Sequence, residues 1–261
     1  MKLNHYALPR LTLRFIPIWR RNLLVWKKSI GTSILGHIAD PLIYLLGLGY
    51  GLGSLLPQMD GASYMTFLAA GTVCYSAMNS TSFEALYVSF SRMHEQRTWD
   101  AIMNTPVTLD DIVLGEALWA VSKGLLSGVT VVAMIWLLGL SHSPMSLWLI
   151  PLALLVGLCF VGIGMIMTAL APSFHFFMYY FTLVITPMML LSGVFFPLTQ
   201  LPHGWQIFAS LLPLTHAVMI ARPLMQGAVP PDLLLHIVVL IGYGGIGFYI
   251  ALVLFRRRFS R

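Results

Sequence analysis

The sequence predicts an all-α integral membrane protein with several transmembrane helices. Of its 261 residues, 58% are hydrophobic and only 9% are charged, and the mean hydropathy is +0.83. Soluble domains carry about 25% charged residues, which keep their surface wetted. A chain this poor in charge must place most of its surface against lipid, where helices satisfy every backbone polar group internally.

Six apolar stretches are long enough to cross a bilayer, because a hydrocarbon core of about 30 Å needs roughly 20 residues per helix. They cover residues 34–56, 64–90, 114–140, 147–170, 176–195 and 233–255. We therefore treat 1–261 as one transmembrane domain. It would consist of a cytoplasmic interfacial helix at 1–30, a six-span bundle at 31–255 and a basic cytoplasmic tail at 256–261.

The distribution of charge predicts the orientation. Of the 15 Lys and Arg residues, seven precede the first span and four follow the last. Positive charge gathers on the cytoplasmic side of membrane proteins, so both termini and the loop with Arg92 and Arg97 should be cytoplasmic. The net charge of +6 then indicates anionic membrane lipids as partners, and no nucleic acid.

The segment before the first span is predicted to be an amphipathic helix lying in the headgroup region. Its apolar side would carry Leu8, Leu11, Phe15, Ile18, Val25 and Trp26, and its basic side Arg14, Arg20, Arg21, Lys27 and Lys28. A solvated basic tail is the alternative. The tryptophans Trp19 and Trp26 favour the membrane interface.

The longest polar stretch in the middle of the chain, residues 91–111, separates the second and third spans. Residues 93–103 can form a short amphipathic helix, and Thr105-Pro106 would end it. Thr108, with Asp110 or Asp111, can cap the helix that enters the third span. Such organisation indicates a structured cytoplasmic element.

The segment 196–232 joins the fifth and sixth spans, and it is too apolar for a water-exposed loop. Six prolines interrupt it. Two short helices that dip into the outer leaflet would fit this pattern if protein satisfies their backbone groups. A lid resting on the membrane surface is the alternative.

Motifs for catalysis or nucleotide binding are missing. The sequence contains no Gly-Lys pair, and hence no phosphate-binding P-loop, and no metal-binding or nucleophile motif. We nominate no catalytic residue and no metal, and we expect no cofactor in this chain.

A few polar residues fall inside the predicted spans, where charge is costly. Glu84 and Lys123 lie deep enough to form an interhelical ion pair or to contact a substrate. Glu116 and Asp40 fall near the cytoplasmic ends, where we expect water to reach them. Tyr75, Asn79 and Phe83 recur one turn apart on the second span, so they are candidates for the substrate path or for packing residues.

Several stretches together resemble the permease subunits of ABC type-2 exporters, the group that includes the nodulation-factor and daunorubicin exporters. The first half of the likeness lies at 40–51 (DPLIYLLGLGYG), 64–72, Phe83-Glu84, 97–103 (RTWDAIM) and 105–107. The second half lies at 191–197 (LSGVFFP), 212–216 (LPLTH) and 222–224 (RPL). Each stretch alone is unspecific, whereas their order and spacing are specific.

This resemblance implies six spans, pairing with a second copy of the chain, and assembly on two copies of a separate ATP-binding cassette subunit. ATP and Mg would be bound by that subunit. The loop after the second span would be a coupling helix seated in a cleft of the ATPase. Glu95 stands where such loops place an acidic residue, whereas Gln96 departs from the second acidic position found in many of them.

From the residues themselves, this loop has the composition of an interface, with apolar anchors and a charged rim. We expect Glu95 to make the charge contact with the ATPase and Trp99 to be the buried anchor. The residues expected to couple to the ATPase are Met93, Glu95, Arg97, Trp99, Asp100, Met103 and Pro106.

The function expected from this resemblance is outward movement of an amphipathic, lipid-linked, oligosaccharide or drug-like substrate across the bacterial inner membrane. A membrane-embedded enzyme that modifies lipid is one alternative, but its reactive groups would have to converge at one depth. A secondary transporter driven by protons or sodium is another. The scarcity of intramembrane charge and of paired broken helices disfavours it.

Overall fold

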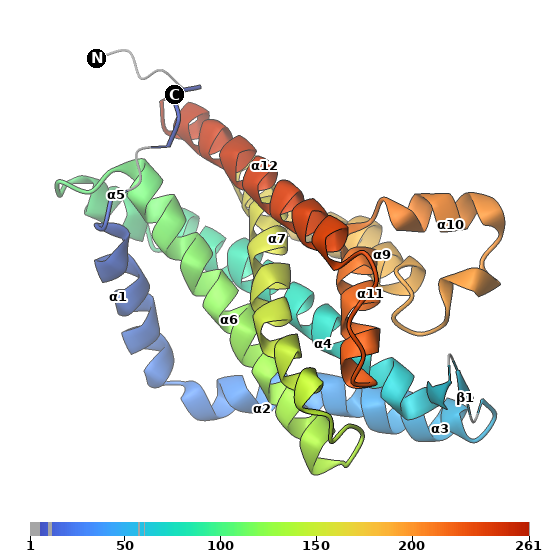
Figure 1. Cartoon of the computed structure of the whole chain (residues 1–261). Helices are drawn as coiled ribbons and strands as arrows, with labels where there is room; N and C mark the ends of the chain where they lie inside the picture. Colours follow the sequence, from blue (N-terminus) through green and yellow to red (C-terminus); the bar gives the residue numbers. More distant parts are fainter. Residues whose placement is uncertain (1–5, 10–11, 57, 60, 261) are drawn as a thin grey trace.

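The computed structural model describes residues 6–9, 12–56, 58–59 and 61–260. The regular structure of these residues is helical except for one antiparallel hairpin, whose strands β1 (Gln58–Met59) and β2 (Ala62–Ser63) have two residues each. Figure 1 shows the start of α1, helix α5 and the C-terminal end of α12 at one end of the molecule, and β1 and α3 at the other. The prediction of an all-α protein with several membrane-spanning helices is confirmed.

Helix α1 (Phe15–Lys27) packs along α6 (Leu109–Leu137) through only part of its predicted apolar side. Ile18 and Asn22 are buried, whereas Val25 is exposed. A Cβ on Gly115 of α6 would lie 2.8 Å from Ile18 Cβ, so glycine permits this close approach. Leu11, which was predicted on the apolar face, lies outside the described residues.

The first apolar stretch consists of α2 (Ile30–Ile43), the π-helical turn η1 (Tyr44–Leu48) and α3 (Gly49–Gly53). It is long and apolar enough to span a membrane, yet only 11% of its most apolar window is buried within the chain. Lipid or another protein must therefore cover most of this helix.

Helix α4 (Tyr64–Phe83) lies in the centre of the molecule and continues through the π-helical turns η2 (Glu84–Val88) and η3 (Ser91–Glu95). Ser63 caps its first turn by accepting a hydrogen bond from the Thr66 amide at 3.2 Å. Its polar residues pair inside the bundle, as with the Ser76 and Ser127 hydroxyls at 2.9 Å. These buried polar groups lower its hydropathy without exposing it to water.

Helices α6, α7 (Leu149–Leu170) and α12 (Leu233–Phe259) form the rest of the bundle. Thr108 and Asp111 form a capping box at the start of α6, which confirms the predicted cap and moves the helix start ahead of the predicted span. The 3-10 turn η4 (Pro144–Trp148) leads into α7. Helix α12 continues to Phe259, so the predicted basic tail at 256–261 is largely helical.

Between α7 and α12 the chain forms short elements. These are α8 (His175–Tyr180), η5 (Phe181–Ile185), α9 (Thr186–Leu191), η6 (Leu198–Gln200), α10 (His203–Ser210) and α11 (Pro213–Met225). Helices α10 and α11 meet at a bend of 91° and are the two short helices expected from the prolines. Their insertion into the outer leaflet stays a prediction.

The described residues contain four helices that are long and apolar enough to cross a membrane, or five if α10 and α11 count as one bent span. Helix α4 is not among the four, and His175–Leu191, in the predicted fifth span, is shorter. The chain is thus a multi-pass membrane protein. The count of six spans is not confirmed by length and hydropathy.

Candidate functional site

The predicted coupling helix at 93–103 is interrupted. The helix that begins with α4 ends at Glu95, and a new helix, α5 (Thr98–Met103), starts after Arg97. Arg97 adopts a left-handed backbone conformation with a φ of 48°, which reverses the chain direction and cannot occur inside a right-handed helix. Helix α5 is therefore shorter than the coupling helix predicted at 93–103, and this turn separates it from the α4 helix.

Helix α5 is fixed to the bundle by its tryptophan. Trp99 is fully buried, with its ring 5.2 Å from that of Phe255 and 6.1 Å from that of Phe259, both on α12. Met93 is also buried, at 6% exposure. The expectation that Trp99 is the side chain buried in a partner therefore needs correction, because α12 already covers it.

The charged residues of the loop are exposed, in contrast to Trp99 and Met93. Glu95, Arg97, Asp100 and Pro106 are exposed, and Met103 is half-buried. Glu95 Oε2 accepts a hydrogen bond from the Ser91 hydroxyl at 2.9 Å, which restrains the carboxylate without removing it from the surface. The exposed part of this loop is thus polar and charged, and Trp99 holds the loop against α12.

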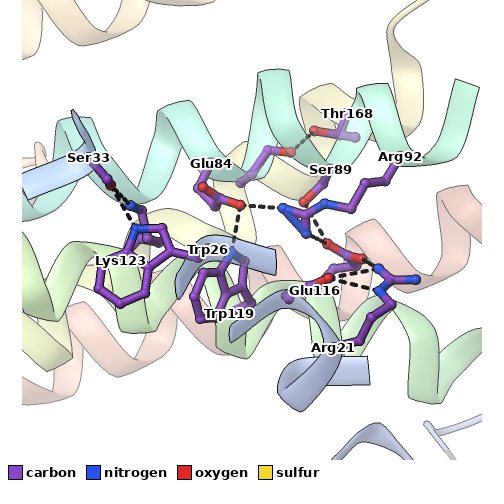
Figure 2. Close-up of polar contacts among 12 residues, drawn as sticks. Arg21, Trp26, Ser33, Glu84, Ser89, Arg92, Glu116, Trp119, Lys123 and Thr168 are labelled. Atoms are coloured by element: carbon purple, nitrogen blue, oxygen red, sulfur yellow. Dashed lines mark hydrogen bonds and ion pairs between the residues drawn. The ribbon is translucent and has the colours of Figure 1, made fainter. Parts of the chain in front are cut away.

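At the end of the α4 helix, two arginines and two glutamates form a network in which Glu84, Arg92 and Glu116 are buried and Arg21 is half-buried (Figure 2). Arg92 donates to Glu116 Oε2 at 2.6 Å and also to Glu84, and Arg21 donates to Glu116 Oε1 at 2.9 Å. Trp119 Nε1 donates to Glu84 Oε1 at 2.7 Å. The two positive and two negative charges balance, and hydrogen bonds satisfy the carboxylates, as buried charge requires.

This ion-pair network of Arg21, Glu84, Arg92 and Glu116 joins three elements that are far apart in the sequence. Arg21 comes from α1, Glu84 and Arg92 from the extension of α4, and Glu116 from α6. Partial burial lowers the pKa of Arg21, and its charge pair with Glu116 acts in the opposite direction. The network therefore fixes α1 to the bundle.

Two expectations from the sequence change here. Glu116 is fully buried and paired, whereas its position in the sequence suggested contact with water. Glu84 pairs with Arg92 rather than with Lys123. Lys123 Nζ instead donates to the Ser33 hydroxyl at 2.5 Å and lies 5.1 Å from the centre of the Trp26 ring.

A cavity of about 830 Å³ opens beside the network, between α1, α2, α4 and α6. Tyr75, Asn79 and Phe83, the candidates for a substrate path, all line it. Gln96 and Thr98 line it as well, so the cavity reaches the turn between α4 and α5. The structure thus brings the candidate path and the loop predicted to couple to an ATPase together in one region.

A second buried ion pair, which the sequence did not indicate, holds the end of α12 against the start of α6. Arg256 contacts Asp110 through two nitrogens, at 2.5 and 2.9 Å. Arg258 donates to the carbonyl oxygens of Thr168, Ala169 and Ala171, where α7 ends. The basic residues at this end therefore hold helices together, in addition to any role in orientation.

Metal-binding chemistry finds no support in the described part of the chain, where no three His, Cys, Asp or Glu residues gather as ligands would. The residues that do gather are those of an ion-pair network, a loop with exposed charge and a cavity. A cavity provides space for a bound molecule, and the exposed loop provides a surface for a partner protein.

Comparison with known proteins agrees with this arrangement. Residues 14–225 match the family described as ABC-2 type transporter. The chain belongs to the ABC-2 type transporter family. This match covers α1, the ion-pair network, the coupling loop and the cavity, and it ends at the last residue of α11. In this family the membrane subunit is a permease that works with an ATP-binding partner subunit.

Two relatives of this ABC-2 permease cover nearly its whole length, and a third covers about three quarters of it. It is 47% identical over 257 residues to nodulation protein J of Rhizobium meliloti, with 98% of each chain covered. It is 46% identical to nodulation protein J of Rhizobium leguminosarum bv. viciae, again with 98% of each chain covered. The inner membrane transport permease YadH of Escherichia coli is 27% identical over 77% of this chain and 78% of its own length.

Proposed function

We propose that this chain is the permease subunit of an ATP-binding cassette exporter in the bacterial inner membrane. It would move an amphipathic, lipid-linked, oligosaccharide or drug-like molecule outward, driven by ATP hydrolysis in a separate subunit. The observation that carries this proposal is the position of the coupling loop. Its exposed charges lie at the end of the α4 helix (Glu95), in the turn (Arg97) and on α5 (Asp100). Helix α5 packs on α12 through Trp99, and the turn lines the 830 Å³ cavity.

A force on the exposed loop can reach the cavity through rigid contacts. Trp99 joins α5 to α12, and Arg92 joins the end of the α4 helix to α6. Packed helices and buried ion pairs transmit a displacement as rigid-body movement. Closure of two ATPase subunits would therefore shift α4 and α6, whose residues line the cavity.

The contact with the ATPase would be made by the exposed residues Glu95, Arg97 and Asp100, with Pro106 at the margin. Met93 and Trp99 support this surface from inside the chain. We assign Glu95 the principal charge contact, because its carboxylate is exposed and held in place by Ser91.

The functional assembly would contain two copies of this chain and two ATPase subunits. The exposed surface of Ile30–Gly53 supports pairing, because this candidate span buries only 11% of its most apolar window inside one chain. The cavity is bordered by α2 of the same span, so a second copy would complete its wall. Six spans, cytoplasmic termini and location in the inner membrane are parts of this proposal.

The test is co-expression of the permease with a candidate ATPase subunit and measurement of the mass of the purified complex in nanodiscs. We expect two permease chains and two ATPase subunits, with ATP hydrolysis that rises when substrate is added. Glu95→Ala should leave the complex intact and reduce that rise, whereas the exposed control Gln58→Ala should behave as wild type. A complex with one permease chain, or full stimulation in Glu95→Ala, would contradict the proposal.

A further inference from the structure

Lys123 is a buried cation in the middle of α6, a helix apolar enough to span the membrane. Only 8% of the residue is exposed. An ionisable side chain at membrane depth is costly and is retained where it has a partner or a ligand. The contacts of Lys123 within the chain are therefore informative.

These contacts are all with neutral groups. Lys123 Nζ donates to Ser33 Oγ at 2.5 Å and lies 5.1 Å from the centre of the Trp26 ring. Within the part of the chain that the structure describes, Lys123 forms no ion pair with a carboxylate. An ammonium group has three donors, and Ser33 accepts one of them.

The neighbouring carboxylate is already neutralised. Glu84 accepts hydrogen bonds from Arg92 and from Trp119, and Figure 2 shows it joined to these residues while Lys123 is joined to Ser33. Arg21 and Arg92, the other cations on the wall of the cavity, are bound to Glu116. Among the described residues of the wall, Lys123 is thus the cation that contacts no carboxylate directly, and the charge of Glu84, which Arg92 binds, acts on it from a distance.

The space beside Lys123 is polar and accessible. Ser33 and His37 lie on the same wall of the cavity, and the Nε2 atom of His37 is buried without a hydrogen-bond partner. Asp40 also lines the cavity, about 10 Å along α2 from Ser33 but only about one turn after His37, so Lys123 and Ser33 lie at the end of the cavity farther from this carboxylate. One end of the cavity therefore presents unused donors and positive charge.

We propose that Lys123, together with Ser33 and His37, binds the anionic group of an amphipathic molecule in this cavity. The group would be a phosphate, sulfate or carboxylate, and the apolar part of the molecule would lie against the apolar residues of the cavity wall, such as Phe83 and Val88. The molecule is either an anionic phospholipid of the bilayer or the exported substrate itself. This inference deepens the proposed substrate path and rests on it, but the binding test requires no ATPase.

The test uses the full chain in phosphatidylcholine nanodiscs with increasing amounts of phosphatidylglycerol, and native mass spectrometry counts the bound anionic lipid. Lys123→Gln should weaken the tightest binding by about tenfold or more, the factor expected from one charge-assisted hydrogen bond. Lys123→Arg should retain most of it. The control Arg97→Gln removes an exposed cation outside the cavity, in the turn after the α4 helix, and should leave that binding unchanged.

A second measurement separates a binding role from a folding defect. A ligand that binds the folded state raises the unfolding temperature, so phosphatidylglycerol should stabilise wild type and Lys123→Arg but not Lys123→Gln. Each variant is first compared in phosphatidylcholine alone. This comparison gives the change in stability that the substitution itself causes.

A third measurement identifies the source of the anion. Wild-type chain taken directly from cells should release an acidic molecule that Lys123→Gln lacks. A phospholipid mass assigns the site to the bilayer, and any other acidic amphiphile assigns it to the substrate. The inference is overturned if Lys123→Gln equals wild type both in phosphatidylglycerol binding and in the molecules that co-purify. That outcome would leave the proposed function untouched, because stimulation of ATP hydrolysis by substrate tests it separately.

Discussion

Arg92 and Glu116 form a buried ion pair of 2.6 Å that joins the end of the α4 helix to α6. The same guanidinium also binds Glu84, so one arginine neutralises parts of two buried carboxylates. Removal of one partner of a buried pair leaves an uncompensated charge and costs about 3–5 kcal/mol. We therefore expect Arg92→Gln to lower the free energy of unfolding by about this amount, measured by thermal or denaturant unfolding in nanodiscs.

The control for this variant is Arg97→Gln, which removes an exposed arginine five residues later and should change stability by less than about 0.5 kcal/mol. Addition of Glu84→Gln to Arg92→Gln should recover part of the loss, because it removes one of the stranded charges. Equal unfolding of Arg92→Gln and Arg97→Gln would show that the network contributes little to stability.

Helices α7 and α12 approach each other so closely that some positions admit only glycine. A Cβ on Gly244 would lie 2.6 Å from the carbonyl oxygen of Leu158, a backbone atom that cannot rotate away. Gly242 has nothing within 4 Å of such a Cβ. We expect Gly244→Ala to force the helices apart at a cost of about 1–3 kcal/mol, whereas Gly242→Ala should be tolerated.

Unfolding of the two alanine variants in the same nanodiscs measures this difference on one helix. The two changes have the same chemistry, so helix propensity cancels. A Gly244→Ala variant as stable as Gly242→Ala would mean that α7 and α12 do not pack in this way.

The proposed orientation can be tested without removal of native cysteines, because Cys74 and Cys159 are both fully buried. We introduce single cysteines at the exposed positions Gln58, Arg97 and Gly204. A membrane-impermeant maleimide should label Gln58→Cys and Gly204→Cys from outside, and Arg97→Cys only after the membrane is permeabilised. Labelling of Gln58→Cys only after permeabilisation would exclude the six-span topology.

Local patterns explain which parts of the fold the sequence could predict. The capping box of Thr108 and Asp111 uses residues three positions apart, so it is readable without tertiary information. The helices α10 and α11 follow from prolines, which restrict the backbone wherever they occur. The apolar stretches likewise predicted α6, α7 and α12, because the membrane requires their length and composition.

The ion-pair network could not be predicted in this way. Helical periodicity placed Arg21 among the basic residues of α1, and only contact with α6 turns it toward Glu116. Glu84 pairs with Arg92 on the extension of its own helix. Hydropathy had instead suggested Lys123 as its partner, because Glu84 and Lys123 both lie deep in predicted spans. Burial of Trp99 depends in the same way on α12, which comes at the end of the chain.

Substitution of Trp99 can distinguish residues that hold the coupling loop on the bundle from residues that contact the ATPase. Its ring fills the space between α5 and the aromatic residues Phe255 and Phe259 of α12. Replacement of a buried aromatic side chain by alanine costs about 3–5 kcal/mol. We expect Trp99→Ala to release α5 from α12, which lowers both stability and recovery of the permease–ATPase complex, because the exposed charges lose their rigid base.

Trp99→Phe is the matched variant, since it keeps an aromatic ring against Phe255 and the indole nitrogen it removes has no hydrogen-bond partner. It should therefore retain both stability and complex recovery. Glu95→Ala should stay as stable as wild type, because an exposed charge contributes less than about 1 kcal/mol. A Trp99→Ala chain that unfolds normally but loses the ATPase would instead mean that the tryptophan leaves α12 and inserts into the partner.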